Sequence, residues 1–265
     1  MKHADITFVI LTKDESANIV ECLQSLPDGS PALVYDAMSA DDTAPRARQL
    51  GATVVQAPWA GYVQARTAAA SLVETPWTFM LDADERITTA LCQELDALEP
   101  PSNLIAYSVS RRNWFCGRPI RCAGWWPDRL VRLFRTGTAH VRARAANKGA
   151  AIHETWHASG DSGELAQALE HHSYESVAQY RRKFARYTDL EAQGPRASFL
   201  TTMGSWLVAP LRFCWLMIGR GGLLEGWRGA YVCAGSALYP AVVATKSRRT
   251  GANESKSGPE GPLLH

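Results

Sequence analysis

The chain has 265 residues, of which 46% are hydrophobic and 20% are charged, so it can bury one full core and carry a smaller appendage. Its formal net charge of +2 gives no bulk argument for a nucleic-acid partner, and we expect none. The six cysteines show no C-x-x-C spacing. They indicate reduced core thiols and neither a zinc site nor a disulfide framework.

The first half of the chain alternates predicted strands with predicted helices. Short runs of β-branched and aromatic residues indicate strands, and apolar residues that recur every three or four positions indicate helices. The expected elements are strands over residues 6–11, 32–35 and 52–56 and in the stretch 77–85, with helices over 18–26 (capped by Ser16), 44–50 (closed by Gly51) and 62–73. This alternation predicts an α/β fold with a mostly parallel central sheet and helices on both faces.

The apolar segment W-T-F-M-L is typical of a buried strand, and it ends abruptly at Asp82, Asp84 and Glu85. Because side chains alternate along a strand, we expect Asp82 and Asp84 to project to the same side. Two such acids repel each other unless a cation lies between them. A hard divalent ion, Mg²⁺ or Mn²⁺, fits there and keeps positions open for a substrate's phosphates. The alternative is a strand that simply ends in solvated acids.

Polar clusters also follow the first and second predicted strands. Because the carboxyl ends of parallel strands meet at one edge of a sheet, all three clusters can converge on a single ligand. An acid after the second strand can accept the imide N–H of a uracil, although turn and N-cap chemistry explains that cluster equally well. Neither G-x-G-x-x-G nor G-x-x-x-x-G-K-[ST] is present, so neither a dinucleotide dehydrogenase nor a P-loop enzyme is indicated. The members of the first two clusters are Thr12, Asp14, Glu15, Asp36, Ser39 and Asp41.

A resemblance to a known family is carried by V-I-L-T-K-D-E, V-Y-D-A-M-S-A-D-D-T and W-T-F-M-L-D-A-D-E. In this order they resemble the nucleotide-sugar half of the inverting glycosyltransferases of family 2, which have the GT-A fold. A narrower branch, which contains the lipopolysaccharide core β-1,4-glucosyltransferases and related cell-envelope sugar transferases, is similar to R-R-N-W-F-C-G-R-P-I-R, G-W-W-P-D-R-L-V-R-L-F-R and I-H-E-T-W. The resemblance covers residues 6–192.

The resemblance implies roles for individual residues. Asp84 is implied as the ligand of a metal ion that bridges the diphosphate of the donor, with Asp82 facing the ribose and the metal. The second motif usually reads D-S-G-S-T-D in the family, so Met38 stands here at a position that is usually glycine. The implied nucleotide-sugar-binding residues are Thr12, Glu15, Asp36, Ser39, Arg66 and Asp82.

The middle of the chain is expected to supply the acceptor side. A strand over 104–110 precedes a basic and aromatic loop over 111–121, and a second strand is expected over 130–135. Aromatic rings suit the apolar faces of sugars and arginines suit phosphates, although a core and a solvated rim explain the same residues. Inversion by direct displacement needs one general base. The resemblance implies Glu154, with Asp128 as the second candidate, and a structural ion pair is the alternative for either.

From residue 164 the pattern turns helical, with an amphipathic helix over 176–191 and then two apolar stretches over 199–218 and 227–244. Each stretch is near the length of a membrane span. Three interpretations of these stretches are open: an interfacial helical hairpin, a pair of helices that spans the membrane, and a soluble helical cap. Tryptophans, flanking arginines and interruptions such as Pro210 favour a hairpin in the headgroup layer. The expected domains are a catalytic domain over 1–195, a membrane-associating segment over 196–245 and a disordered tail over 246–265.

Together these patterns predict a metal-dependent inverting glycosyltransferase that takes a sugar, most simply glucose, from a UDP-sugar. The expected acceptor is a lipid-linked cell-envelope saccharide such as lipopolysaccharide core. The first apolar run is too short for a signal peptide and is broken by Lys13, so we expect a peripheral protein on the cytoplasmic face of the inner membrane. A sugar-phosphate nucleotidyltransferase and a non-catalytic sugar-nucleotide-binding protein are the alternatives.

Overall fold

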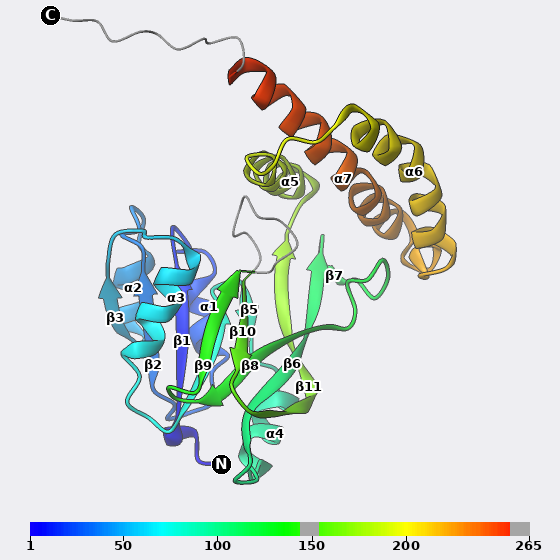
Figure 1. Cartoon of the computed structure of the whole chain (residues 1–265). Helices are drawn as coiled ribbons and strands as arrows, with labels where there is room; N and C mark the ends of the chain where they lie inside the picture. Colours follow the sequence, from blue (N-terminus) through cyan, green and yellow to red (C-terminus); the bar gives the residue numbers. More distant parts are fainter. Residues whose placement is uncertain (144–153, 255–265) are drawn as a thin grey trace, which may run out of the picture. The chain divides into compact units, whose positions relative to one another are not determined.

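The computed structural model describes residues 1–143 and 154–254, which form two compact units (Figure 1). The first unit contains the N-terminal 121 residues and most of the chain from Trp125 to Ser173. The second unit contains the chain from Tyr174 onward, together with Cys122–Gly124. The first unit holds all the sheet structure described below, and the second is helical.

Within the described residues, the first unit is built on a nine-stranded sheet in the order β3-β2-β1-β4-β8-β6-β11-β5, with β7 paired to β6. The pairs β3–β2, β2–β1 and β1–β4 are parallel, whereas β4–β8, β8–β6 and β11–β5 are antiparallel. The α/β class, with a parallel central sheet and helices, is therefore confirmed. The strands are β1 Ile6–Thr12, β2 Ala32–Asp36, β3 Thr53–Gln56, β4 Trp77–Asp82, β5 Glu85–Arg86, β6 Leu104–Phe115, β7 Arg118–Pro119, β8 Asp128–Arg135 and β11 Asp161–Tyr174.

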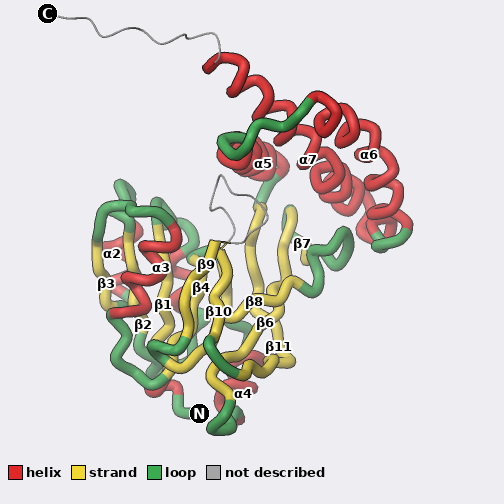
Figure 2. Tube along the Cα trace, in the orientation of Figure 1, coloured by secondary structure: helices red, strands yellow, loops and turns green. Residues whose placement is uncertain are grey.

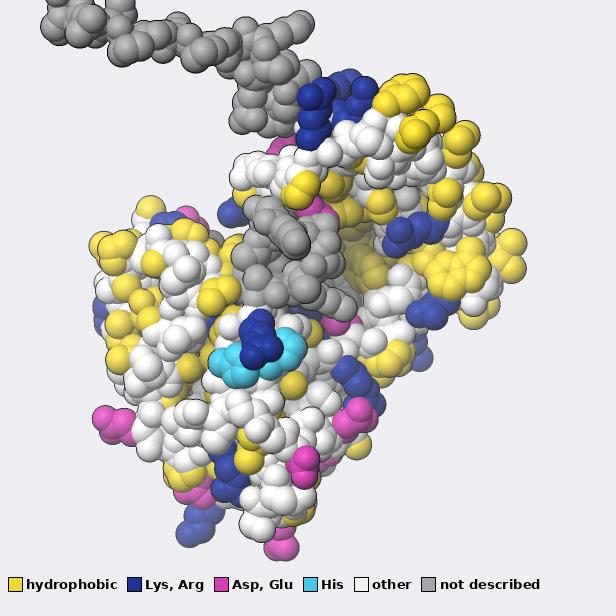
Figure 3. Space-filling model, in the orientation of Figure 1, with side chains coloured by type: hydrophobic (Ala, Val, Ile, Leu, Met, Phe, Trp, Pro, Cys, Tyr) yellow, Lys and Arg dark blue, Asp and Glu magenta, His cyan; other side chains and the backbone are white. Residues whose placement is uncertain are grey.

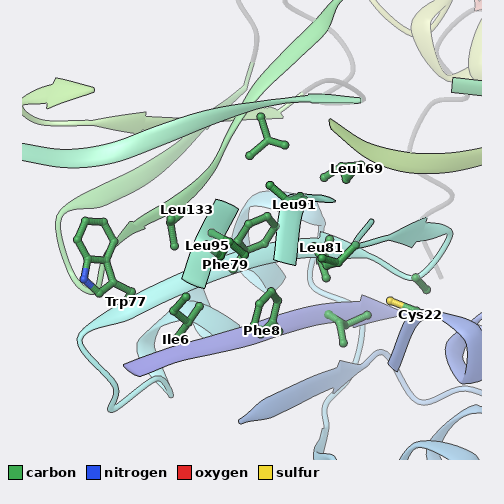
Figure 4. Packing of buried hydrophobic residues seen from close by; sticks show 14 of the residues in the cluster. Ile6, Phe8, Cys22, Trp77, Phe79, Leu81, Leu91, Leu95, Leu133 and Leu169 are labelled. Atoms are coloured by element: carbon green, nitrogen blue, oxygen red, sulfur yellow. The ribbon is translucent and has the colours of Figure 1, made fainter. Parts of the chain in front are cut away.

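Two apolar layers cover the two faces of this sheet, because successive strand residues point to opposite sides. On one face, Phe8 stacks on Phe79 with ring centroids 5.1 Å apart, and the layer extends to residues of α1, α2 and α4 (Figure 4). On the other face, Val9 and Met80 pack with α3 and with Trp156 of a separate two-stranded sheet. Each fully buried large apolar side chain stabilises the fold by about 1.5–3 kcal/mol. The remaining elements of this unit are α1 Ile19–Gln24, α2 Thr43–Gln49, α3 Tyr62–Ser71, α4 Thr89–Ala97, β9 Ala139–Ala143 and β10 Glu154–Ala158.

Three local expectations were wrong. The segment expected as a loop over 111–121 is a hairpin, since β6 continues to Phe115 and pairs with β7. The chain from Glu164 to Tyr174 is part of β11 and not helix. Ser16 does not cap α1, because its N–H donates to Asp41 (3.0 Å) and the helix starts at Ile19. In the last two cases a partner distant in sequence decides the local structure.

The second unit consists of α5 Val177–Glu191, α6 Phe199–Ile218 and α7 Gly226–Glu254, with a 3₁₀ turn, η2 Gly222–Glu225, between the last two (Figure 2). Both α5 and α6 pack against α7. The tail that was expected to be disordered from residue 246 is helical at its start, because α7 continues to Glu254; residues 255–265 lie outside the described part. Among the described helices none alone has the length and hydropathy of a membrane span, whereas α6 and the following helix, bent by 72°, pass that test as a pair.

Candidate active site at the carboxyl edge of the parallel strands

The predicted convergence of strand ends is confirmed by the register of the sheet. Thr12, at the end of β1, pairs with Asp36 at the end of β2, and Leu11 pairs with Asp82 at the end of β4. These three strands lie side by side in the parallel half of the sheet (Figure 1). The polar residues that follow them therefore share one edge, where α/β sheets bind their ligands.

Asp36 is fully buried and accepts hydrogen bonds from four protein donors. Oδ1 accepts from the hydroxyls of Thr12 (2.9 Å) and Ser39, and Oδ2 accepts from the Ser39 N–H (3.0 Å) and from Nε2 of Gln56 (2.9 Å). Burial alone would raise the pKa of Asp36, but these hydrogen bonds hold the pKa below its usual value. Asp36 is thus an ionised residue that fixes Thr12 and Ser39 in place.

The loops after β1 and β2 are joined by hydrogen bonds. Asp14 donates its N–H to the Ser39 hydroxyl (2.8 Å) and accepts the Ala40 N–H (2.7 Å), while Lys13 donates to the Met38 carbonyl (2.7 Å). Asp14 and Met38 both have positive φ, 54° and 56°. Asp tolerates this left-handed conformation, but a side chain such as methionine is strained by it. The backbone at Met38 therefore has the left-handed conformation that suits glycine, although the side chain is methionine.

Met38→Gly is accordingly expected to stabilise the protein by about 1 kcal/mol. The exposed methionine side chain (54%) has little burial to lose, and glycine removes the cost of the left-handed backbone. Urea unfolding measures the change. Leu50→Gly, at an exposed helix-end residue with negative φ, is the matched control and should lose stability. If Met38→Gly instead lowers the free energy of unfolding, the left-handed backbone at Met38 does not strain the protein.

Glu15 and Arg66 are two more of the predicted donor-binding residues, the first in the loop after β1 and the second on α3. The Glu15 N–H donates to Thr43 (2.8 Å) and its carboxylate accepts from Asn18 (2.8 Å), so it anchors the start of α1. Arg66, on α3, reaches the end of β4, where its Nη2 lies 2.7 Å from Oδ1 of Asp82. Arg66 thus pairs with the first acid at the end of β4.

Asp82 is held by arginines. Besides Arg66 on Oδ1, Arg132 of β8 donates to Oδ2 (2.8 Å), and Arg111 of β6 lies 4.0 Å from the same oxygen. Burial would raise the pKa of Asp82, but Arg66 and Arg132 hold the pKa well below its usual value. Of the three arginines of β8, Arg132 is the one that contacts these acids, whereas Arg129 pairs with Glu164 and Arg135 donates to the Leu104 carbonyl. The protein's own cations thus neutralise one acid of the D-x-D pair.

Glu85 completes this arginine cluster. It is fully buried, accepts the N–H of Asp82 (2.9 Å) and pairs with Arg132 and with Arg111 (3.3 Å). Arg132 is itself buried, and although burial would lower its pKa, Glu85 and Asp82 raise it. Arg111 continues the cluster to Asp128 at the start of β8 (2.6 Å). The acids and arginines therefore form one charge network, in which each buried charge has a partner.

Asp84 has different surroundings. The strand ends at Asp82, and Asp84 lies in the turn between β4 and β5, so strand alternation does not place it as expected. Its Oδ1 is 3.4 Å from Nε2 of His171 on β11, and its carbonyl accepts the N–H of His172 (2.8 Å). The two members of the D-x-D pair thus differ, since one contacts arginines and the other a histidine.

Asn113, a buried residue of β6, orients His171. Its amide nitrogen donates to the Trp125 carbonyl (3.1 Å) and points to Asp128 (3.4 Å), so its oxygen faces Nδ1 of His171 at 2.6 Å. Nδ1–H then donates to Asn113, so Nε2 is the ring atom that faces Asp84.

A carboxylate and an imidazole nitrogen, the ring held by a hydrogen-bonded amide, form a pair of side chains of the kind that binds a divalent cation. Mg²⁺ and Mn²⁺ sites often use only one or two side chains and take further oxygens from substrate phosphates. Among the residues that the structure describes, no group of three or more His, Cys, Asp and Glu side chains could hold a metal. Asp84 and His171 therefore suit a cation that arrives with an anionic substrate.

Of the two candidates for the general base, Asp128 has a described side chain and Glu154 does not. Asp128 is bound by Arg111 through Nε (2.9 Å) and Nη2 (2.6 Å). Burial would raise the pKa of Asp128, but Arg111 and Asn113 keep it below its usual value. Glu154 is the first residue of β10 and pairs with Ala143, and its side chain lies outside the described part of the structure.

Reasoning from sequence missed Asn113, placed Glu85 at the strand end without its arginine partners, and gave no role to Arg111 or His171 at the strand ends. Three of them come from β6 and β11, antiparallel strands that reach the site from the far half of the sheet. A signal was present in Glu85, an acid directly after a buried strand with two arginines available in later strands. Nothing local marks Asn113.

No family model matches the chain. An uncharacterized glycosyltransferase of Rickettsia felis is 36% identical over 108 residues, which cover 39% of this chain and 38% of that protein. The lipopolysaccharide core biosynthesis glycosyltransferase LpsC of Rhizobium meliloti is 27% identical over 134 residues, or 48% of this chain and 50% of that protein. The chain thus matches half or less of the length of these relatives.

Among solved structures, the mannosyltransferase PcManGT from Pyrobaculum calidifontis, in complex with GDP-Man and Mn²⁺, has a TM-score of 0.53 to this chain. The match covers 92% of this chain and 86% of that one, at 14% sequence identity. Such a likeness concerns the fold. The chain therefore has the GT-A-like α/β fold that the sequence predicted, and the two relatives compared with it in sequence are glycosyltransferases.

Proposed function

We propose that the protein is an inverting glycosyltransferase that moves a sugar from a nucleoside-diphosphate sugar to a hydroxyl of its acceptor. The observation that carries the proposal is the pairing of Asp84 with an oriented His171 beside the arginine-bound Asp82. This donor pair lies at the carboxyl edge of the parallel strands, in a fold shared with a mannosyltransferase. The similarity to glycosyltransferases over part of the chain supports the same reaction.

In this proposal Asp84 and His171 hold Mg²⁺ or Mn²⁺. The bound cation supplies neutralisation of the charge that develops on the departing diphosphate. Asp82, fixed by Arg66 and Arg132, lines the same edge and faces the ribose. Since both of its oxygens already contact arginines, we assign it a weaker share in cation binding than the sequence alone suggested.

The nucleotide is proposed to lie over the ends of β1 and β2, against Thr12, Glu15, Asp36 and Ser39. We favour a UDP-sugar, with glucose as the sugar, because the resemblance in sequence points to that donor. The acceptor is proposed to be a lipid-linked cell-envelope saccharide, which agrees with the role of LpsC in lipopolysaccharide core biosynthesis. The catalytic part is assigned to residues 1–195.

For the general base we propose Glu154. The second candidate, Asp128, is less suited to accept a proton, because Arg111 stabilises its ionised form and holds its pKa low. Asp128 instead orients Arg111 and Asn113.

Glu154→Gln is expected to lower kcat by about 10²–10⁴-fold, since it removes the proton acceptor and keeps the shape of the side chain. Nucleotide affinity should change by less than about twofold. Calorimetric binding of the nucleotide, measured beside transfer rates, separates the two effects. Glu164→Gln, at an exposed residue that pairs with Arg129, is the matched control. Full turnover in the Glu154 variant, with loss in Asp128→Asn, would move the role to Asp128.

A donor screen tests the function as a whole. The protein is incubated with Mn²⁺ and each of several nucleoside-diphosphate sugars, and nucleotide binding and sugar release are read separately. Binding together with release of a nucleoside diphosphate supports glycosyl transfer. Release of pyrophosphate from a nucleoside triphosphate and a sugar phosphate would instead identify a nucleotidyltransferase. Binding without any release, even with acceptor lipids present, would identify a non-catalytic sugar-nucleotide-binding protein.

A further inference from the structure

The outward side of α6 is a continuous apolar surface. Its large side chains recur every three or four residues and remain exposed, as Leu211 (72%) and Ile218 (74%) show, and the turn adds Leu224 (91%). Hydrophobic side chains gather over α6 and the turn in Figure 3. We call this set the outer face: Phe199, Leu200, Met203, Trp206, Leu207, Leu211, Trp215, Ile218, Leu223, Leu224 and Trp227.

The buried side of the same helices consists mostly of small side chains. The buried residues of α6 are Thr202, Ala209 and Leu216. On α7 the buried residues include Ala237, Ala241 and Ala244. A helix of a water-soluble unit normally buries its large apolar side chains and exposes polar ones. Here small residues fill the helix contact and the large ones point outward, which is the arrangement of helices that face lipid.

Arginines border the outer face and lie against its aromatic rings. The guanidinium of Arg220 is 5.4 Å from the ring centroid of Trp215, that of Arg228 is 4.7 Å from Trp227, and Arg248 is 5.1 Å from Phe199. Tryptophan beside arginine is typical of the layer between hydrocarbon and water, where a ring is half immersed and a cation meets phosphate.

The second unit is also strongly basic. Residues 174–249 contain eleven Lys and Arg against four Asp and Glu, a net charge of +7, whereas the whole chain carries only +2. The exposed residues Arg181, Arg182 and Arg186 of α5 contribute to this charge. Positive charge is thus concentrated in the unit that carries the apolar surface. That combination attracts an anionic lipid layer.

We propose that the outer face inserts into the headgroup layer of an anionic lipid bilayer. A second copy of this chain fits the surface less well, because a symmetric pairing would bring two units of net +7 together. The proposal does not depend on the sugar chemistry, since it concerns α5–α7 and not the strand ends. It gives the protein a place at the membrane surface whichever donor it uses.

Flotation of the intact protein with lipid vesicles tests this directly. We compare vesicles of phosphatidylcholine alone with vesicles that contain about 30% phosphatidylglycerol, at low and at high salt. We expect at least about tenfold stronger partition to the anionic vesicles, and a loss of that difference at high salt because screening weakens the attraction. No sugar donor is present, so a failure here is distinct from a failure of transfer.

Leu207→Asp combined with Leu211→Asp is expected to reduce partition at least about tenfold, because two carboxylates then face the hydrocarbon boundary. Leu50→Asp combined with Leu72→Asp makes the same two changes at exposed leucines (42% and 48%) of the first unit and should leave partition unchanged. Circular dichroism confirms that each variant is folded. Absence of flotation, equal flotation with both vesicles, or equal losses in the two sets of variants would each overturn the proposal. So would a dimer in gel filtration that the Leu207 and Leu211 changes dissociate without any change in flotation.

Discussion

Replacing Asp84 by asparagine is expected to lower kcat/KM at least about 10³-fold. The substitution keeps the size of the side chain but removes the negative charge that faces Nε2 of His171, 3.4 Å away. A cation would then lose its only carboxylate in this donor pair, and stabilisation of a departing diphosphate by several kcal/mol would be lost. Transfer rates over a range of Mn²⁺ concentrations measure the effect.

A second measurement separates this role from a structural one. Manganese binding in the presence of nucleoside diphosphate, followed by electron paramagnetic resonance, should weaken at least about tenfold in the Asp84→Asn protein while its unfolding midpoint in urea hardly moves. Asp161→Asn, at an exposed acid where β11 begins, is the matched control. Unchanged manganese binding and unchanged turnover would remove Asp84 from the metal site and the proposed reaction with it.

Arg132→Met is expected to destabilise the fold by about 3–5 kcal/mol. Arg132 is almost completely buried and contacts Asp82 (2.8 Å) and the fully buried Glu85. Methionine keeps most of the side-chain volume, so the loss comes from two carboxylates that each lose one arginine partner, Asp82 keeping Arg66 and Glu85 keeping Arg111. Urea unfolding measures the change in the free energy of unfolding.

The neighbouring Arg129 provides the control on the same strand. Arg129 is 40% exposed and pairs with Glu164 (2.5 Å), so Arg129→Met should cost less than about 1 kcal/mol. Adding Glu85→Gln to Arg132→Met should recover part of the stability, because it removes the fully buried one of the two carboxylates that lost a partner. If both arginine variants lose the same amount, the buried network does not stabilise the protein as its contacts indicate.

Much of the fold could be predicted because its signals are local. Each βα unit from Ile6 to Asp82 has its own run of strand residues and its own helical period, and α6 ends where its apolar run ends, at Ile218. The strand β11 could not be found in this way. Leu165, Ala168 and Leu169 are spaced as on a helix, and only pairing with other strands of the sheet makes this segment extended.

In the site, too, the features with local signals could be predicted and those that depend on distant strands could not. Acids directly after strands could be assigned to the edge of the sheet, since strand order within βαβ units is constrained. Their partners could not, because Arg111, Asn113 and His171 arrive on strands whose register is set by the whole sheet. The sequence therefore predicted a cation between Asp82 and Asp84, whereas in the structure Asp82 contacts arginines and Asp84 lies beside His171.

The four donors around Asp36 have a consequence for how a nucleobase is chosen. With two lone pairs on each oxygen, this carboxylate has no acceptor position left, so an incoming ring N–H must take the place of Thr12, Ser39 or Gln56. In the nucleotide position that we propose, binding at Asp36 therefore exchanges one hydrogen bond for a similar one, and discrimination among bases there is expected to be weak. Gln56 is the exposed donor of the set and hence the one most easily displaced.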